Sequence, residues 1–216
     1  MLFWRKVSKI ELGKPISVEQ LINKARNPNT GWGGLYYGNI SAIANLISAN
    51  QIIEVGVAYG GHAHFILSNS STIKYLGVDP YVFNYDPNDA FCSDVERYLG
   101  LKGQLAMDVL FSGVQDSLNA YESRSKILRL DSIKFAEMIP DESESLVFLD
   151  NNHTYNHVTS EIASWWPKIK EKGVLAGDDY WMKDVSSAVN DFVSKHSLEL
   201  MFVSKNDYKT WFIQKL

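Results

Sequence analysis

Residues 52–65 read IIEVGVAYGGHAHF, an apolar run that passes through a glycine-rich turn into a helical segment. Glu54 lies within the apolar run, and Gly56 permits a tight turn directly after it. Gly60 and Gly61 let the backbone come close to a ligand where the helix begins. The glycine spacing differs from the G-x-G-x-x-G dinucleotide fingerprint, which weakens a dinucleotide-binding interpretation. The stretch therefore predicts a strand, a ligand-binding turn and a helix.

The same alternation continues along the chain. Short apolar runs separated mostly by stretches with helical spacing indicate a parallel sheet that is covered on both faces. The predicted parallel strands are 51–56, 74–79, 126–131, 145–150 and 173–178. The predicted helices among and after them are 60–68, 104–122, 132–138, 154–166 and 183–196. Two final runs, 198–204 and 209–215, are joined by a link short enough for a hairpin. The predicted fold class is α/β, with a doubly wound, mostly parallel seven-stranded sheet that ends in an antiparallel hairpin.

The segment before the first strand forms a separate layer in this prediction. Residues 17–26 and 38–48 read as short amphipathic helices. We therefore predict one domain, in which residues 1–48 form an N-terminal helical cap on a core at 49–216.

Two other segments are candidates for covering a ligand. Trp32, Tyr36 and Tyr37 lie in or next to a glycine-rich turn between the two N-terminal helices, where they either cap a pocket or staple the helices to the core. Residues 80–103 show no helical pattern, and a connection of this length is typical of a functional loop or lid.

Composition limits the compartment and the partners. The net charge of −4 gives no electrostatic reason to expect nucleic acid or an anionic membrane as a partner. The single cysteine, Cys92, cannot form an internal disulfide, which fits a reducing compartment. No apolar segment is long enough for a signal peptide or a membrane span. We therefore predict a cytoplasmic protein whose partner is a small molecule.

Carboxylates gather at the ends of the predicted strands. Asp79, Asp131, Asp150 and Asp178 each end one strand, and Glu54 lies two residues before the end of the first. Ligands of an open parallel sheet bind at the carboxyl ends of its strands. A single aspartate at such a position is usually a turn or helix-capping residue. Five acids near one edge are harder to assign to capping, and together they indicate a binding site.

Two of these strand ends carry additional polar side chains. The stretch FLDNNHTYNHV places His153 three residues after Asp150, and GVLAGDDYW ends its apolar run in Asp178 and Asp179. On its own, His153 reads as an exposed residue at the start of a helix. With three aspartates expected at the same edge, it becomes a candidate for proton transfer.

These motifs resemble a known enzyme family. E-x-G-x-x-x-G after the first strand, with GVDP closing the second, is similar to class I S-adenosylmethionine-dependent methyltransferases over about residues 35–216. The stretches LVFLDNNHTYNHV and WWPKIKEKGVLAGDDYW resemble the metal-dependent small-molecule O-methyltransferases of the catechol and macrolide-sugar types. In that group, an aspartate after the fourth strand and an acidic pair after the fifth hold a divalent cation. A base stands three residues after the first aspartate. The resemblance implies a Rossmann-like methyltransferase fold.

The resemblance also implies a role for each candidate residue. The implied metal ligands are Asp150, Asp178 and Asp179, and the implied catalytic residues are His153, as general base, and Asp150. The implied S-adenosylmethionine contacts are Glu54, Gly56, Gly60, Gly61, Asp79, Asp131 and Ser132. Among these, Asp79 would bind the ribose hydroxyls, and Asp131 with Ser132 would flank the adenine.

The expected reaction is methyl transfer to a hydroxyl of a small molecule, such as a sugar or polyol. Three carboxylates form a hard-oxygen site, so Mg²⁺ is the first choice, with Mn²⁺ or Ca²⁺ as alternatives. A helix N-terminus and a nearby cation both disfavour imidazolium, so we expect His153 to be neutral and able to accept a proton. Two other functions stay open: a nicotinamide-dependent oxidoreductase on a related sheet, and a non-catalytic cofactor-binding module. A homo-oligomer is also compatible with the sequence.

Overall fold

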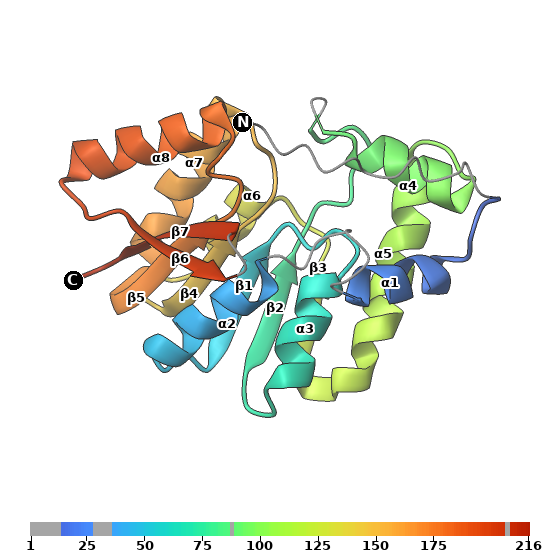
Figure 1. Ribbon diagram of the computed structural model, residues 1–216, viewed down its shortest axis with the longest axis horizontal. Helices are drawn as coiled ribbons and strands as arrows, with labels where there is room; N and C mark the ends of the chain where they lie inside the picture. The colour runs from blue at the N-terminus through green and yellow to red at the C-terminus, as the bar shows by residue number, and fades with distance from the viewer. Residues whose placement is uncertain (1–13, 28–35, 87–88, 206–207) are drawn as a thin grey trace.

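The computed structural model describes residues 14–27, 36–86, 89–205 and 208–216. Within them the chain forms a seven-stranded sheet with the order β3-β2-β1-β4-β5-β7-β6 (Figure 1). The strands are β1 (Gln51–Val55), β2 (Lys74–Val78), β3 (Ser125–Leu128), β4 (Glu144–Leu149), β5 (Ile169–Gly177), β6 (Met201–Lys205) and β7 (Tyr208–Gln214). β1 to β5 are parallel, whereas β7 runs antiparallel to both β5 and β6. The predicted sheet with its antiparallel terminal hairpin is confirmed.

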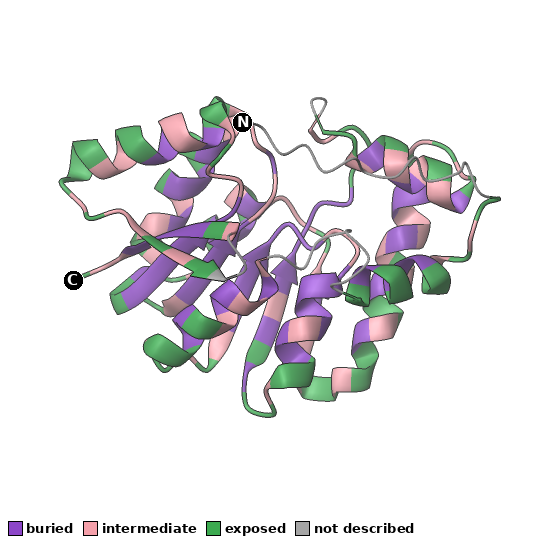
Figure 2. Cartoon of the chain, viewed as in Figure 1, coloured by how far each residue is buried: buried purple, intermediate pink, exposed green. Residues whose placement is uncertain are grey.

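Helices cover both faces of this sheet. One face packs against α1 (Val18–Arg26), α2 (Tyr37–Leu46), α3 (Gly61–Asn69), α4 (Phe91–Leu99) and α5 (Gln104–Leu118). The other face packs against α6 (Ser132–Met138), α7 (Tyr155–Trp165) and α8 (Lys183–His196). Successive strand residues point to opposite faces, so Ile52 joins the first core and Ile53 the second. The central strands are therefore buried along most of their length (Figure 2).

Both N-terminal helices pack into the first of these cores. Leu21 of α1 and Ile40 of α2 are fully buried there. Ser17 caps α1 by accepting from the backbone N–H of Gln20, whose side chain accepts in return from the backbone of Ser17. The two described helices of the predicted cap thus belong to the same layer as α3, α4 and α5. Residues 1–13 and 28–35 of the predicted cap lie outside the described residues. None of the helices in the described residues is long and apolar enough to cross a membrane.

The strand register brings the candidate acids to one edge. The last residues of β1, β2, β4 and β5 pair with one another across the sheet. The backbone N–H of Asp150 donates to the carbonyl of Val55 at 2.8 Å, and that of Asp178 donates to Leu149 at 3.1 Å. The hydrogen-bond ladder therefore continues one residue past these strand ends. Asp79, Asp150 and Asp178 emerge at this one edge, with β1 between the strands that precede Asp79 and Asp150.

One predicted strand-end acid proves to be a helix cap. β3 ends at Leu128, so the predicted strand 126–131 was too long. Asp131 instead precedes α6, and its carboxylate accepts from the backbone N–H of Lys134 at 3.1 Å. The capping interpretation, which is the usual one for a single aspartate, is correct at this position.

The prediction that residues 80–103 lack a helix is wrong in its second half. α4 buries Cys92, Val95 and Leu99, which lie three and four residues apart on one helical face. Gly100, with φ of +65°, ends the helix in the left-handed conformation. The predicted helix 104–122 consists of α5 followed by a 3₁₀ turn, η2 (Asn119–Arg124).

Gly56 is the point at which the chain leaves β1 and crosses the end of β4. Its φ is +89°, and a Cβ at this position would lie 1.8 Å from the carbonyl oxygen of Asp150. Gly56→Ala is expected to lower the free energy of unfolding by about 2–4 kcal/mol, because it adds backbone strain and displaces the strand end that carries Asp150. Gly103→Ala is the control, since Gly103 has φ of +59° but no atom within 4 Å of its Cβ position. Urea denaturation that gave equal losses for both variants would show that contact with Asp150 imposes no constraint.

Candidate functional site

Three side chains converge beyond the ends of β4 and β5. Nε2 of His153 lies 2.9 Å from Oδ2 of Asp179 and 3.9 Å from Oδ1 of Asp150. One potential ligand atom from each of the three lies within 4.8 Å of the other two. Asp150 follows β4 and Asp179 follows β5, so the pairing of these strands brings them together. The sequence prediction that the two strand ends are neighbours is confirmed.

Asp178 lies beside this group, and its side chain is buried. Oδ2 is 3.2 Å from the Tyr208 hydroxyl, whereas Oδ1 has no hydrogen-bond partner among the described residues. Burial raises the pKa of Asp178 well above its usual range, and the charges of Asp150 and Asp179 raise it further. An unpartnered buried carboxylate oxygen costs free energy. A carboxylate oxygen without a hydrogen-bond partner is also available to bind a cation.

Two tyrosines support these carboxylates. The hydroxyl of Tyr36 donates to Oδ2 of Asp150 at 2.7 Å, and that of Tyr208 lies 3.2 Å from both Asp178 and Asp179. Tyr36 also lines the pocket described below, and its ring packs against His62 and Phe148 of the core, so both roles open to it are observed. Tyr37 instead stacks on His62 in the interior. Trp32 lies outside the described residues.

His153 is held among carboxylates on several sides. Its Nδ1 lies 3.6 Å from Asp86 and 3.7 Å from Asp89, opposite the Asp150 and Asp179 side of the ring. Burial lowers the pKa of His153, but Asp150 and Asp179 outweigh burial and raise the pKa to about 11. The neutral ring expected from the sequence therefore requires a cation that offsets these carboxylates. The N-terminus of α7 alone does not lower the pKa of His153 enough to keep its ring neutral.

A pocket of about 360 Å³ extends from this group toward the end of β2. Gly56 and Asp79 line it together with Asp150, His153 and Asp178. The three loops that follow β1, β2 and β4 thus share one cavity with the acidic cluster.

Asp79 fixes the first loop from inside this pocket. Its Oδ2 accepts from the backbone N–H groups of Val57 at 2.9 Å and Ala58 at 3.0 Å. Its Oδ1 accepts from the N–H of Tyr81 at 2.7 Å. Burial raises the pKa of Asp79, although these three hydrogen bonds act in the opposite direction. A carboxylate has about four acceptor positions, so about one is left for a ligand.

Glu54 and the paired glycines have other neighbours and do not line the pocket. Glu54 is buried, with His62 Nδ1 at 2.6 Å and a short hydrogen bond from the Tyr75 hydroxyl. Cβ atoms at Gly60 and Gly61 would meet protein atoms, the side chain of Val114 and the carbonyl of Ala25 respectively.

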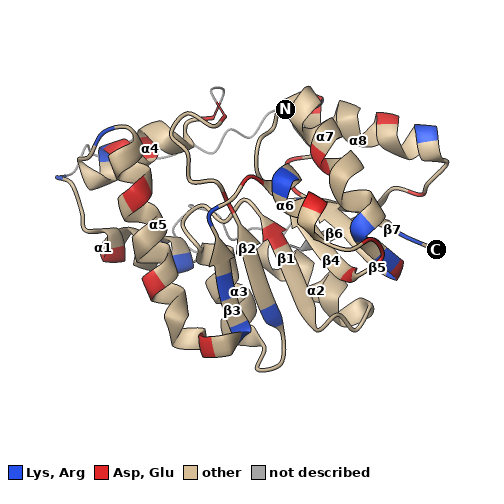
Figure 3. Ribbon diagram, turned by 180° about the vertical axis from the view of Figure 1, so that it is seen from behind, with Lys and Arg blue, Asp and Glu red and all other residues tan. Residues whose placement is uncertain are grey.

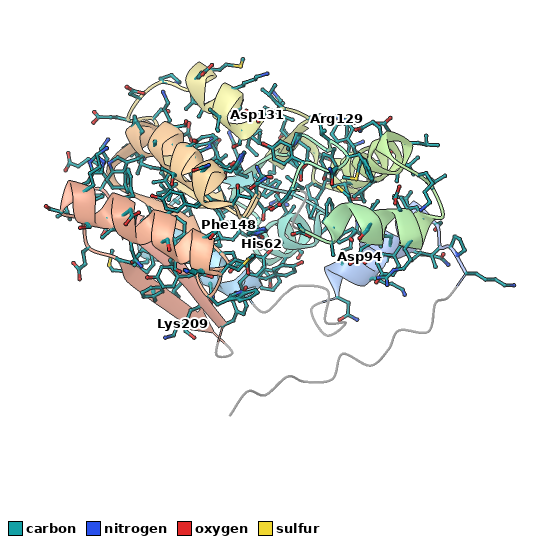
Figure 4. All side chains as sticks on the ribbon, turned by 90° about the horizontal axis from the view of Figure 1, so that it is seen from above. His62, Asp94, Arg129, Asp131, Phe148 and Lys209 are labelled. Atoms are coloured by element: carbon teal, nitrogen blue, oxygen red, sulfur yellow. The ribbon has the colours of Figure 1, made fainter. Side chains whose placement is uncertain are left out.

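The ring that Glu54 holds lies deep in the core. His62 is edge-on to Phe148, with ring centroids 5.4 Å apart, and the two residues are close together in Figure 4. His62 is therefore a packing residue of the core and does not line the pocket.

Asp131 and Ser132 also lie outside the lining of the pocket. Asp131 caps α6 and accepts from the Tyr85 hydroxyl at 2.9 Å. The hydroxyl of Ser132 donates to Glu161 of α7 in a short, buried hydrogen bond. Tyr85 therefore covers the position that the resemblance assigns to adenine contacts. Binding of adenine between these residues would require Tyr85 to move.

The first part of segment 80–103 contacts the site directly. The backbone N–H of His153 donates to Oδ2 of Asp86 at 3.0 Å, and the amide of Asn152 donates to the Tyr85 carbonyl at 3.2 Å. These contacts join residues that are 67 positions apart in the chain, so the sequence pattern of segment 80–103 could not predict them. The lid role remains a prediction.

Comparison with known families connects this site to an activity. The sequence model of a family described as a methyltransferase domain matches residues 53–180, which include the end of β1, all of β4 and β5, and the acidic cluster. No curated protein is significantly similar in sequence.

Several solved structures share the fold. The O-methyltransferase NovP is 19% identical, with a TM-score of 0.60 over 91% of this chain and 88% of that one. A putative caffeoyl-CoA O-methyltransferase from Staphylococcus aureus is 14% identical, with a TM-score of 0.61 over 92% and 93%. CalS11, a TDP-rhamnose 3′-O-methyltransferase of calicheamicin biosynthesis, is 13% identical, with a TM-score of 0.55 over 94% and 88%.

Proposed function

The chain belongs to the methyltransferase domain family, and we propose that it moves a methyl group from S-adenosylmethionine to a hydroxyl of a small molecule, assisted by a divalent cation. The observation that carries this proposal is the convergence of Asp150, His153 and Asp179 beside the pocket that contains Asp79. The acceptor class is a sugar, a polyol or another molecule with neighbouring hydroxyls. Such a molecule could present two oxygens to the cation.

The side chains present fit a cation such as Mg²⁺. Asp150, Asp178 and Asp179 would hold it, because three carboxylates at one edge repel one another and Oδ1 of Asp178 has no partner among the described residues. Tyr36 and Tyr208 each engage carboxylate oxygens of this set, which fixes their orientation. Bound there, the cation would lower the pKa of a hydroxyl that coordinates it.

The remaining steps belong to the chain's own residues. His153 lies 2.9 Å from Asp179 and takes the proton of the acceptor hydroxyl once its ring is neutral. The loop held by Asp79 positions the cofactor, whose sulfonium supplies an electrophilic methyl group. Holding both reactants beside the same base removes most of the entropic cost of their encounter.

Asp79→Ala is expected to weaken binding of S-adenosylhomocysteine by about 1.5–3 kcal/mol, because a charge-assisted hydrogen bond to the ribose is lost. The variant also frees the amides of Val57 and Ala58, so loop damage has to be separated from loss of the ribose contact. An analogue without the ribose 2′-hydroxyl separates them. The wild type should lose affinity for it, whereas Asp79→Ala should bind both ligands alike. Unchanged affinity of the variant by calorimetry would sink the assignment.

A thermal-shift comparison tests the cofactor class before any acceptor is known. S-adenosylmethionine and S-adenosylhomocysteine should raise the melting temperature at concentrations well above their dissociation constants, whereas NAD should not. A shift with NAD alone would favour a nicotinamide enzyme. If the protein bound the cofactor and the metal but methylated no hydroxylated compound, the interpretation as a non-catalytic cofactor-binding module would be favoured.

A further inference from the structure

A second pocket, of about 630 Å³, opens on the other side of the acidic cluster. It lies between Asp86, Asp89 and Ala90 on one side and the segment that follows β5 up to the start of α8 on the other. His153 and Asp179 line this pocket and also the pocket that contains Asp79. The candidate base and one candidate metal ligand therefore stand between two cavities. If Asp79 marks the cofactor side, the second cavity is the place from which an acceptor reaches the base.

The rim of this second pocket carries an exposed aromatic ring. The side chain of Trp181 is 76% exposed, which is unusual for a tryptophan in a folded domain. Its indole Nε1 donates to Oδ1 of Asp179 at 2.7 Å, so the ring is held beside a candidate metal ligand. A fixed, exposed indole offers a face to the C–H side of a sugar or to a cation.

The lining of this pocket is predominantly acidic. Among the described residues, the acids that line it are Asp86, Asp89, Asp179 and Asp184. The described part of the lining contains Lys183 as its one lysine, His153 as its one histidine, and no arginine. Figure 3 shows acidic residues on the loops at this edge of the sheet.

A bound divalent cation would not reverse this balance. It would offset Asp179 together with Asp150 and Asp178, but among the described lining residues Asp89 and Asp184, which face each other across the pocket, would still outnumber Lys183. An acceptor that brings a phosphate would meet like charges on both walls, which costs affinity in a partly closed cavity.

We propose that the pocket between Asp86 and Trp181 is the acceptor subsite and that it selects a positively charged acceptor, an amine-bearing polyhydroxylated molecule such as an amino sugar or amino alcohol. This proposal rests on the proposed methyl transfer and names its substrate class. The hydroxyls reach His153 and the cation, the apolar side packs on Trp181, and the ammonium group lies toward Asp89 and Asp184. Phosphorylated or nucleotide-linked acceptors are disfavoured.

A matched series of acceptors tests the charge preference. The probes are three catechols that differ at one substituent: 4-(2-aminoethyl)catechol, 4-ethylcatechol and 3-(3,4-dihydroxyphenyl)propionate. With Mg²⁺ and S-adenosylmethionine, kcat/KM should fall in that order. The amine should exceed the carboxylate by about tenfold or more at low salt, and by less at high salt. Equal values, or preference for the neutral or anionic probe, would overturn the proposal.

Two variants locate the preference in the pocket. Asp184→Asn should lower the amine-to-carboxylate ratio about two- to fivefold, mainly through KM, because it removes one exposed carboxylate. Asp191→Asn is the control, since Asp191 lies on the same helix but does not line the pocket. An equal change in both variants would mean that the overall charge of the protein, and not this pocket, sets the preference.

Paramagnetic broadening of an NMR signal by charged nitroxides measures the charge of the pocket without requiring turnover. The indole N–H signal of Trp181, assigned by its loss in Trp181→Phe, should be broadened more by a cationic nitroxide than by a matched anionic one. Asp184→Asn should reduce the difference, and Asp191→Asn should leave it unchanged. Equal broadening by the two nitroxides would overturn the proposal, whatever the catechols show. Absence of methyl transfer to every probe, with the nitroxide difference present, would count against the proposed methyl transfer and not against the charge of the pocket.

Discussion

His153→Ala is expected to lower kcat by about 10²–10⁴-fold while leaving the affinity for S-adenosylhomocysteine nearly unchanged. Methyl transfer makes the acceptor oxygen cationic unless its proton leaves. His153 lies at the junction of the two pockets, within 2.9 Å of Asp179. The loss should be largest near neutral pH. It should shrink at high pH, where a cation-bound hydroxyl ionises without a base.

The same variant separates two roles for the imidazole. His153 belongs to the group of three side chains that could ligate a metal, so it could bind the cation instead of accepting a proton. If it is the base, His153→Ala should keep its Mn²⁺ affinity and lose rate. If it is a ligand, the variant should lose both. A variant with wild-type kcat across the pH range would show that His153 is only a residue at the start of α7.

The second large effect concerns the cation. Excess chelator should abolish methyl transfer, and Mg²⁺ should restore it, because Asp150, Asp178 and Asp179 are the proposed ligands of the ion and the cation would help the acceptor hydroxyl to ionise. Asp150→Asn and Asp179→Asn should each be inactive at Mg²⁺ concentrations that saturate the wild type. Asp191→Asn, an acid outside the cluster, should retain activity. Full activity in chelator would reduce the three aspartates to caps or cofactor contacts.

The pH dependence of metal binding follows from the charges around the cluster. Asp150 and Asp179 raise the pKa of His153 to about 11, so in the absence of a cation the ring carries a proton at neutral pH. A cation at the same carboxylates favours loss of that proton. Metal affinity should therefore rise with pH, by up to about tenfold per pH unit for each proton displaced.

The fold could be predicted from sequence because its strands are short, apolar and separated by helices with clear spacing. The register could also be inferred in outline, since parallel strands place their carboxyl ends at one edge, and Asp79, Asp150 and Asp178 follow that rule. Asp131 is the exception: it does not end a strand but caps α6, because an aspartate before a helix makes a good cap. The helix α4 was missed because three of its buried positions, Cys92, Val95 and Leu99, stand within a polar stretch.

The site was harder to predict where it depends on side chains from distant segments. Tyr208 reaches Asp178 only because β7 inserts beside β5, and Tyr36 reaches Asp150 from the residue before α2. Asp86 meets His153 through a loop that has no periodicity to read. Short motifs identified the acids, whereas tertiary packing alone supplied the groups that orient them.

Mn²⁺ binding measured by electron paramagnetic resonance tests the central claim most directly, because it needs neither an acceptor nor turnover. Protein saturated with S-adenosylhomocysteine should take up one Mn²⁺ per chain, and Mg²⁺ should displace it. Asp150→Asn and Asp179→Asn should lose this binding, and Asp191→Asn should keep it. If the wild type bound no Mn²⁺ at millimolar concentration, or if the two cluster variants bound it as the wild type does, these carboxylates would not form a metal site and metal-assisted methyl transfer would be wrong.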